Sequence, residues 1–286
     1  MAKTRRNLII FIVIALASGW LGVLVDTFLI EQPKGDTLGM GLWLILPLLT
    51  AITLSIVSRD WKNAGLTPKL KGNLKWYLLS LSLFPAIAVV TLSAAKLFGF
   101  VDLSKIEIDT VLPLIATGFA INIIKNVFEE FAWRGFLTPK LIEMKINDWL
   151  LYLISGLVWG LWHVPYYLIF LDDSVFEALS VSRVEFVFIA TMIILCWNVI
   201  YVELFRLAKS VFPCTIMHAT EDGVVMFLFA GEYYVFTNNI NTWIFDPHVG
   251  VVATVLVLGT GLILRSIRMK AQKTMKYKKQ SNNSII

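Results

Sequence analysis

Three short polar motifs interrupt a chain of 286 residues that is otherwise rich in apolar side chains. The first places Glu129, Glu130 and Arg134 in the stretch NVFEEFAWRGF. The second places His163 in VWGLWHVP, and the third places His218 in MHATEDG. Glutamate and histidine together are typical of sites that activate water by acid–base chemistry, or of sites that bind a metal ion. The motifs predict such a site if the fold brings them together.

Helix geometry gives the two adjacent glutamates different surroundings. Glu130 and Arg134 share a helical face in the order that favours an ion pair. Glu129 is turned about 100° away from Glu130, so we expect it to be unpaired and to face a cavity. The alternative is a salt-bridged collar at a helix end, without a chemical role. Lys125 precedes Glu129 by four residues and either pairs with it, extends toward a lipid headgroup or lines the cavity, and the sequence leaves these options open.

The histidine motifs also have a structural and a chemical interpretation. His163 lies within an apolar segment, one helical turn after Trp159, and a single buried histidine is more often a packing residue than a catalyst. His218 and Asp222 are expected to stack at positions i and i+4 of a helix, where they either orient an imidazole for chemistry or join two helices by a hydrogen bond.

Two further ionisable residues are not expected to contribute to the site. Glu221 is assigned to a different helical face from His218. His248, the third histidine of the chain, stands beside Pro247 in an outer loop and belongs to no recognisable motif.

The composition places the chain among membrane proteins. Hydrophobic residues make up 57% of it, charged residues 16%, and the mean hydropathy is +0.74, far above the level of a soluble domain. A net charge of +5 could indicate a nucleic-acid partner, but the basic residues flank apolar segments, so we expect the lipid bilayer as the partner and no nucleic acid. The apolar segments predict one all-α bundle of eight transmembrane helices, at about 8–30, 40–58, 74–98, 111–136, 150–170, 184–206, 211–230 and 248–268.

The basic residues also predict how that bundle lies in a cell membrane. With the N-terminus inside, the inside segments hold 20 of the 25 lysines and arginines, which is the bias of cytoplasmic segments. Both termini are therefore expected in the cytoplasm. Residues 15–17 resemble a signal-peptidase site, but the apolar segment continues well past them, so the first helix is expected to be retained.

The chain divides into four parts on this basis. Residues 1–110 hold three spans and a basic, tryptophan-bearing loop at 59–75 that is expected to lie on the membrane surface. Residues 111–230 carry all three motifs and form the expected catalytic core. The last span falls in 231–270, and the polar, lysine-rich tail 271–286 is expected to be disordered.

The ordered motifs resemble those of the CPBP family, the type II CAAX prenyl endopeptidases and their bacterial relatives, often called Abi or bacteriocin-immunity proteins. The resemblance covers about residues 110–230 and consists of EE-x-x-x-R, an aromatic residue four before a histidine, and H-x-x-x-D. It implies an eight-helix intramembrane protease, of the glutamic or metalloprotease type, with a polar cavity open to the cytoplasm.

The resemblance also implies roles for individual residues. Glu129 would activate the hydrolytic water, His163 would hold or polarise it, and His218 and Asp222 would stabilise the developing oxyanion. Glu130, Arg134 and Trp159 would support the site. Asp222 stands where many members have asparagine, and because an ionised carboxylate cannot donate a hydrogen bond, Asp222 must either be protonated or orient His218.

These observations favour an intramembrane endopeptidase that hydrolyses a membrane-associated peptide, of CAAX type or bacteriocin-related, with water activated by Glu129. A metal-free mechanism is favoured over a zinc site, which would use Glu129, His163 and His218 and would have to gather its ligands from three helices without an H-E-x-x-H motif. The alternative functions are a non-catalytic membrane scaffold or bacteriocin-immunity factor that binds a partner through the same cavity, and a transporter, for which no inverted repeat is evident.

Overall fold

The computed structural model describes residues 2–29, 31–33, 36–226, 228 and 233–283. This part of the chain is almost entirely helical, which confirms the predicted all-α class. Within these described residues, seven helical segments are long and apolar enough to cross a membrane, so the chain is a multi-pass membrane protein: Ala2–Asp26, Leu38–Ser58, Leu74–Leu97, Ile108–Glu143, Asp148–Phe170, Arg183–Ala208 and Val251–Met275. The expected span at 211–230 is not among them: residues 227, 229 and 230 lie outside the described residues, and the α-helix within the described part has nine residues before the helical geometry changes.

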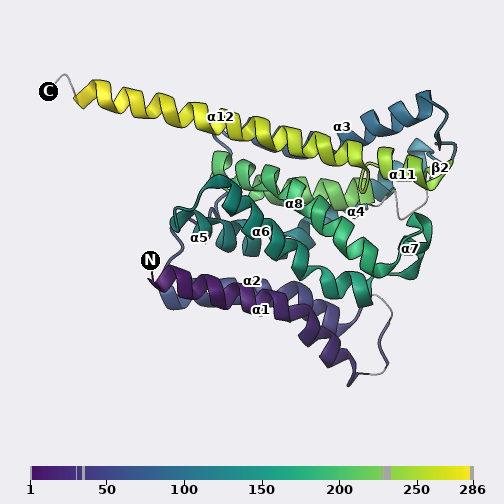
Figure 1. Ribbon diagram of the computed structural model, residues 1–286, viewed down its shortest axis with the longest axis horizontal. Coiled ribbons are helices and arrows are strands. Elements are labelled where there is room, and N and C mark those ends of the chain that lie inside the picture. The colour runs from purple at the N-terminus through teal and green to yellow at the C-terminus, as the bar shows by residue number, and fades with distance from the viewer. Residues whose placement is uncertain (1, 30, 34–35, 227, 229–232, 284–286) are drawn as a thin grey trace.

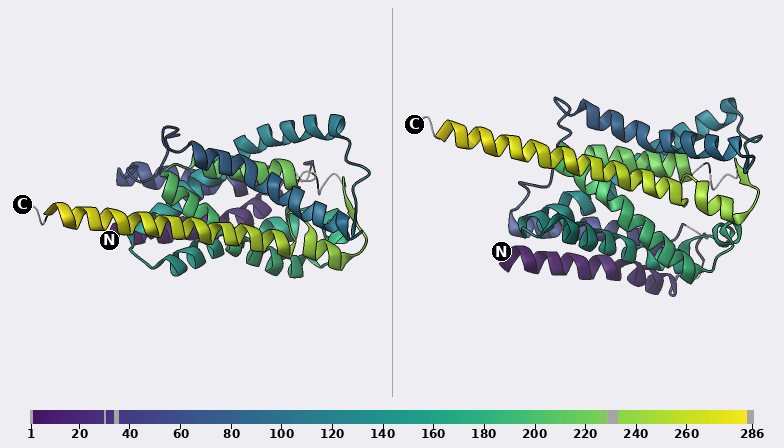
Figure 2. Two further views of the ribbon diagram at one scale, coloured as in Figure 1. Left: turned by 90° about the horizontal axis from the view of Figure 1, so that it is seen from above. Right: turned by 45° about the horizontal axis from the view of Figure 1, so that its top comes forward.

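The long helices run roughly along one direction, and both chain ends lie at the same end of the molecule (Figures 1 and 2). One side is formed by the pair α1 and α2, and the opposite side by α12 and α3. Between them, α6 packs against both α1 and α8, and α8 packs against α12. The bounds of these helices are α1 Ala2–Asp26, α2 Leu38–Ser58, α3 Leu74–Leu97, α6 Asp148–Trp162, α8 Arg183–Ala208 and α12 Val251–Asn283.

Polar residues cap the first turns of several of these helices. The Thr37 hydroxyl accepts a hydrogen bond from the first turn of α2, and the Asn147 side chain does the same for α6. Ser182 and Glu185 form a complete capping box at the start of α8. Each cap satisfies backbone N–H groups that the helix itself leaves without a partner.

Each of the three polar motifs lies at a π-helical turn: the first and third motifs end within one, and the second is followed directly by one. The first turn lies between α4 and α5, the second follows the end of α6, and the third continues α9. A π turn is rare in helices and frequent at functional sites, because it widens the helix by one residue. The bounds are α4 Ile108–Ala132, η1 Trp133–Leu137, α5 Thr138–Glu143, η2 Tyr166–Phe170, α9 Phe212–Thr220 and η3 Glu221–Met226.

Glycines allow the helices of the core to approach closely. A Cβ atom on Gly156 would lie 2.9 Å from Leu195, and one on Gly160 would lie 3.0 Å from Thr191, so α6 and α8 meet at this small-residue face. A Cβ atom on Gly223 would lie 2.6 Å from the backbone of Phe119. The missing side chain at Gly223 therefore lets η3 lie directly against α4.

Backbone contacts join separate segments of the chain at each end of the bundle. At one end, the basic loop that precedes α3 is fixed to the turn between α8 and α9, because the Val211 N–H donates to the Gly65 carbonyl at 3.0 Å. At the other end, β1 (Val101–Asp102) pairs with β2 (Val235–Phe236), close to the short helix α11 (Asn239–Phe245). The short helix α7 (Asp173–Leu179) connects η2 to α8.

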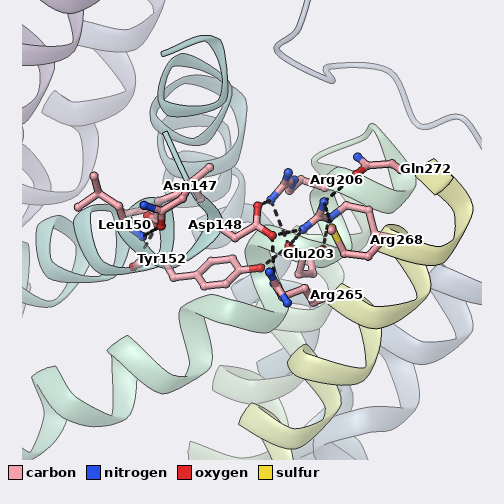
Figure 3. Close-up of polar contacts among 12 residues, drawn as sticks. Asn147, Asp148, Leu150, Tyr152, Glu203, Arg206, Arg265, Arg268 and Gln272 are labelled. Carbon is pink, nitrogen blue, oxygen red and sulfur yellow. Dashed lines mark hydrogen bonds and ion pairs between the residues drawn. The ribbon is translucent and has the colours of Figure 1, made fainter. Parts of the chain in front are cut away.

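A network of ion pairs joins α6, α8 and α12 at the end of the bundle that carries both termini (Figures 1 and 3). Asp148 contacts Arg206 at 2.8 Å, Arg268 at 2.7 Å and Arg265 at 3.0 Å. The fully buried Glu203 accepts hydrogen bonds from Arg268 and from the Tyr152 hydroxyl. Such a network satisfies buried charges that would be unfavourable singly.

The C-terminal tail differs from the prediction. Residues 271–283 continue α12 as a helix and are not disordered as expected. The polar composition of the tail was interpreted as a sign of disorder, but lysine, glutamine and methionine are good helix formers, and a long preceding helix supplies the nucleus.

Candidate active site

A cavity of about 150 Å³ lies among α4, α6, α8 and η3, with α2, α7 and the segment after α11 completing its walls. Most of its lining is apolar or aromatic, including Tyr166, Tyr167, Phe186 and Trp197. Ionisable side chains of the second and third motifs also line it, together with Lys125, which precedes the first motif, and two residues not expected at the site: Lys125, His163, His218, Glu221, Asp222 and His248. Widely separated parts of the sequence therefore meet at one small cavity.

Glu130 and Arg134 form the predicted ion pair. Arg134 Nη1 donates to Glu130 Oε1 at 2.9 Å, and the two side chains are 1% and 0% exposed. The guanidinium carbon lies 4.2 Å and 4.5 Å from the ring centroids of Trp159 and Tyr201, a cation–π arrangement. His218 Nδ1 lies 3.0 Å from the same Glu130 oxygen, so the pair also fixes the orientation of the His218 ring.

Glu129 has partners of its own, which corrects the expectation that it is unpaired. Its Oε1 lies 3.2 Å from Lys125 Nζ, and Trp159 Nε1 donates to its Oε2 at 3.3 Å. The carboxylate is 2% exposed, and Lys125 rather than Glu129 lines the cavity. The sequence had left three options open for Lys125, and the structure shows that it both pairs with Glu129 and lines the cavity.

Asp222 is held by the same lysine. Its Oδ2 accepts hydrogen bonds from Lys125 Nζ at 2.9 Å and from Asn126 Nδ2 at 2.8 Å. The His218 Nε2 atom is 3.8 Å from that oxygen. Hydrogen bonds from an ammonium and an amide group favour the ionised carboxylate, and Asp222 Oδ2 acts here as an acceptor.

His163 lies at the end of α6, where its own backbone caps the helix. Its Nδ1 lies 2.9 Å from the carbonyl oxygen of Trp159. Because that contact places the ring proton on Nδ1, the Nε2 atom keeps its lone pair. The Glu129 carboxylate interacts electrostatically with both His163 and His218.

Glu221 and His248 were not expected to contribute, and both line the cavity. Glu221 Oε2 lies 3.7 Å from His218 Nε2, and Glu221 Oε1 lies 2.9 Å from His248 Nδ1. Residues three apart are only about 60° from one another on a helix, and Glu221 begins a widened π turn, so the assignment to a separate face was wrong.

No local motif reveals His248, because tertiary structure brings it to the cavity. The buried Asp246 carboxylate accepts hydrogen bonds from the backbone N–H groups of His248 and Val249, at 2.8 Å and 2.9 Å. Burial raises the pKa of Asp246, and the backbone hydrogen bonds oppose this effect. The turn formed by these bonds directs His248 toward η3.

His218, Glu221 and Asp222 lie close enough together to hold a metal ion. His218 Nδ1 bonded to Glu130 is the arrangement seen in metal-bound histidines, whose second nitrogen is oriented by a carboxylate. Asp222, however, already binds the ammonium group of Lys125, which competes with a cation for the same oxygen. This set shares only His218 with the zinc set expected from the sequence.

Comparison with known protein families gives a match over the part of the chain that contains the three motifs. Residues 110–224 match the family model described as type II CAAX prenyl endopeptidase Rce1-like. The match begins at α4 and ends within η3, and it contains each site residue predicted from the sequence. This confirms the family indicated by the motifs. No curated protein matches the chain significantly.

Proposed function

We propose that this chain, which belongs over residues 110–224 to the Rce1-like family of CAAX prenyl endopeptidases, hydrolyses a membrane-associated peptide with water activated by Glu129. The observation that carries the proposal is that Glu129, at the end of α4, interacts electrostatically with His163 and His218, which both line one cavity. A buried carboxylate that interacts with two imidazoles is suited to general base catalysis.

The proposed reaction is a direct attack by water. Glu129 takes a proton from the water molecule, and the resulting hydroxide attacks the carbonyl carbon of the scissile peptide bond. The tetrahedral intermediate breaks down when protonated Glu129 returns a proton to the leaving nitrogen. The products are a carboxylic acid and an amine, and Glu129 is again ionised; the acid then gives its proton to the amine, which leaves a carboxylate and an ammonium group.

The two histidines have different roles in this proposal. The Nε2 lone pair of His163 accepts a hydrogen bond from the water and orients it. The His218 ring lies among the carboxylates of Glu130, Glu221 and Asp222, which favours its imidazolium form, and Nε2–H then donates to the oxyanion. The Glu130–Arg134 pair holds that ring in place.

We also propose eight membrane crossings, with both termini on the cytoplasmic side. The expected opening of the site to the cytoplasm is not supported by the cavity walls, which come in part from α7 and from the segment before α12, at the end of the bundle away from the termini (Figure 1). Two contacts support the eighth crossing: Val211 lies at the end of the bundle occupied by the 59–73 loop, and Phe236 lies at the β1 end. Since α3 spans the distance between those ends, the chain from Val211 to Phe236 spans it too. The position of both termini at one end supports an even number (Figure 1).

The proposed substrate is a peptide that is itself attached to the membrane, of CAAX type or related to bacteriocins. The aromatic and aliphatic lining of the cavity supports an apolar ligand, since such walls gain little from a hydrated one.

The proposal is tested with Glu129→Gln in proteoliposomes that contain a fluorogenic peptide ending in a prenylated Cys-aliphatic-aliphatic-X sequence. The substitution keeps the side-chain shape and removes the base, so we expect a loss of cleavage of about 100-fold or more. Glu177→Gln, an exposed glutamate of α7, is the matched control and should cleave as the wild type does.

A second measurement identifies the natural substrate. Comparison of membrane proteomes between wild-type and Glu129→Gln cells should reveal an uncleaved precursor that accumulates only in the variant. Cleavage at the wild-type rate by Glu129→Gln would contradict the proposal. A cellular phenotype that survives alanine at both Glu129 and His218 would indicate the scaffold function instead.

A further inference from the structure

We propose that Lys125 is a catalytic residue of this chain, whose ammonium group donates a hydrogen bond to the scissile carbonyl oxygen as negative charge develops there. The inference rests on the proposed function and goes beyond it, because the motifs assign no role to Lys125.

The position of Lys125 is the first argument. Its Nζ lies 3.2 Å from Glu129 Oε1 and 2.9 Å from Asp222 Oδ2. An ammonium group has three N–H donors, and these contacts occupy two of them. The side chain is 34% exposed and lines the cavity, so the third donor can point into it.

The reach of Lys125 is the second argument. A water molecule activated by Glu129 lies within hydrogen-bond distance of that carboxylate, and the carbonyl it attacks lies within about 3.5 Å of the water. Because Lys125 Nζ already touches the Glu129 carboxylate, a carbonyl oxygen placed for attack falls within reach of Nζ. A donor that stabilises the oxyanion must point at the position that this oxygen takes in the transition state.

The third argument is that the neighbouring polar groups already make hydrogen bonds to one another. Asp222 is an acceptor and cannot donate. Asn126 Nδ2 already donates to Asp222, and Trp159 Nε1 donates to Glu129. Of the described side chains that contact Glu129 or Asp222, Lys125 and His218 are therefore those with a donor left for an oxyanion.

This arrangement gives Asp222 a positioning role. Its carboxylate holds the lysine at the site and balances its charge, so that the apolar cavity tolerates an ammonium group. In the reaction, Lys125 keeps its proton throughout. The proton from water still moves to Glu129 and then to the leaving nitrogen, and the C–N bond breaks as the oxyanion re-forms a carbonyl.

The test compares Lys125→Met and Lys125→Arg with the wild type in proteoliposomes, using the prenylated fluorogenic peptide. Methionine keeps much of the shape and removes the charge and the donors, so kcat should fall about 100- to 1000-fold, as for the loss of an oxyanion-hole donor. KM should change by less than about threefold, because the interaction forms mainly in the transition state. Arginine should restore part of kcat.

Two controls separate the possible causes. Lys96→Met, in the exposed last turn of α3, should leave kcat and KM unchanged. A phosphinate peptide, whose anionic tetrahedral phosphorus mimics the intermediate, should bind Lys125→Met more weakly by about the factor lost in kcat/KM. An uncleaved ground-state peptide should bind both proteins equally, which a purely structural role for Lys125 would not produce.

The outcomes distinguish this inference from the proposed function. Wild-type or faster cleavage by Lys125→Met, with Glu129→Gln inactive, would overturn the inference and leave the proposed function standing. Faster cleavage in particular would show that Lys125 only weakens Glu129 as a base. If Glu129→Gln cleaves as the wild type does, both the proposed function and the role of Lys125 are overturned.

Discussion

Glu129 and Glu130 are adjacent in the sequence, yet each has a cationic partner on a different side of the helix. Glu130 pairs with Arg134, and both side chains are almost completely buried. Glu129 pairs with Lys125, whose side chain is one-third exposed toward the cavity. A guanidinium group held between two aromatic rings is fixed, whereas a lysine at a cavity wall is able to move when a substrate enters.

At the residue scale, sequence spacing predicts contacts within one helix well and contacts between helices poorly. The Glu130–Arg134 pair follows from i,i+4 geometry alone. The contact between Lys125 and Asp222 joins residues 97 positions apart, and that between Glu221 and His248 also crosses elements. No helical period reports such contacts, so the roles of Lys125, Glu221 and His248 depended on the tertiary structure.

Whether cleavage requires a bound metal ion can be measured directly. We expect cleavage of the prenylated peptide to change by less than about twofold after exhaustive chelation, because Lys125 occupies the Asp222 oxygen that a cation would need. Activity before and after chelation, with elemental analysis of the purified protein, provides the readout. A metal site at His218 and Glu221 would instead be established by two results together. Chelation would lower the cleavage activity by more than about tenfold, and added zinc would restore that activity in the wild type but not in Glu221→Gln.

At the scale of elements, the length of the apolar segments correctly predicted the long helices. The π turns were not predicted, because their sequences WRGFL, YYLIF and EDGVVM have no distinct local signal. The short α9 and its π turn also explain why the seventh expected span does not count as a long apolar helix. The hydropathy of that segment predicts a membrane span, but the hydropathy does not show that its polar residues His218, Glu221 and Asp222 line the cavity.

The close contact between η3 and α4 gives a prediction for this scale. A Cβ atom at position 223 would overlap the backbone of α4 near Phe119, so Gly223→Ala should lower stability by about 1–3 kcal/mol and reduce cleavage as η3 moves away. Thermal unfolding in detergent and the peptide assay measure the two effects.

Gly259 in α12 provides the matched control for Gly223. Nothing lies within 4 Å of the position that its Cβ would take. Gly259→Ala should therefore be neutral or stabilising by about 0.5–1 kcal/mol, as expected for glycine in a helix. Equal stability of the two alanine variants would show that the η3–α4 contact is not close.

At the scale of the whole molecule, α12 is attached to the core at one end by charge and along its length by apolar packing. The network of Asp148, Glu203 and three arginines joins it to α6 and α8 (Figure 3). Asn198 of α8 contacts both Arg134 and the backbone of Tyr152, which itself reaches Glu203. The charged end of the bundle and the active site therefore share the same two helices.

Removal of Glu203 should weaken this attachment. Glu203→Gln leaves Arg268 buried with one carboxylate fewer, and breaking a buried pair in this way costs about 3–5 kcal/mol. We expect a clear fall in the thermal unfolding temperature and faster proteolysis of the helix beyond Arg268. Glu177→Gln, at the surface, should stay within about 0.5 kcal/mol of the wild type. Wild-type stability of Glu203→Gln would show that the network contributes little.

The π turns have one more consequence, which concerns the number of residues and not their types. Each turn contains one residue more than the same length of α-helix, so the helix that follows is rotated by about 100° relative to an uninterrupted one. The directions of α5 and of the segments beyond η2 and η3 thus depend on chain length within the turns. Two related sequences could share every side chain of the three motifs and still build different cavities, if one of them lacks a single residue at such a turn.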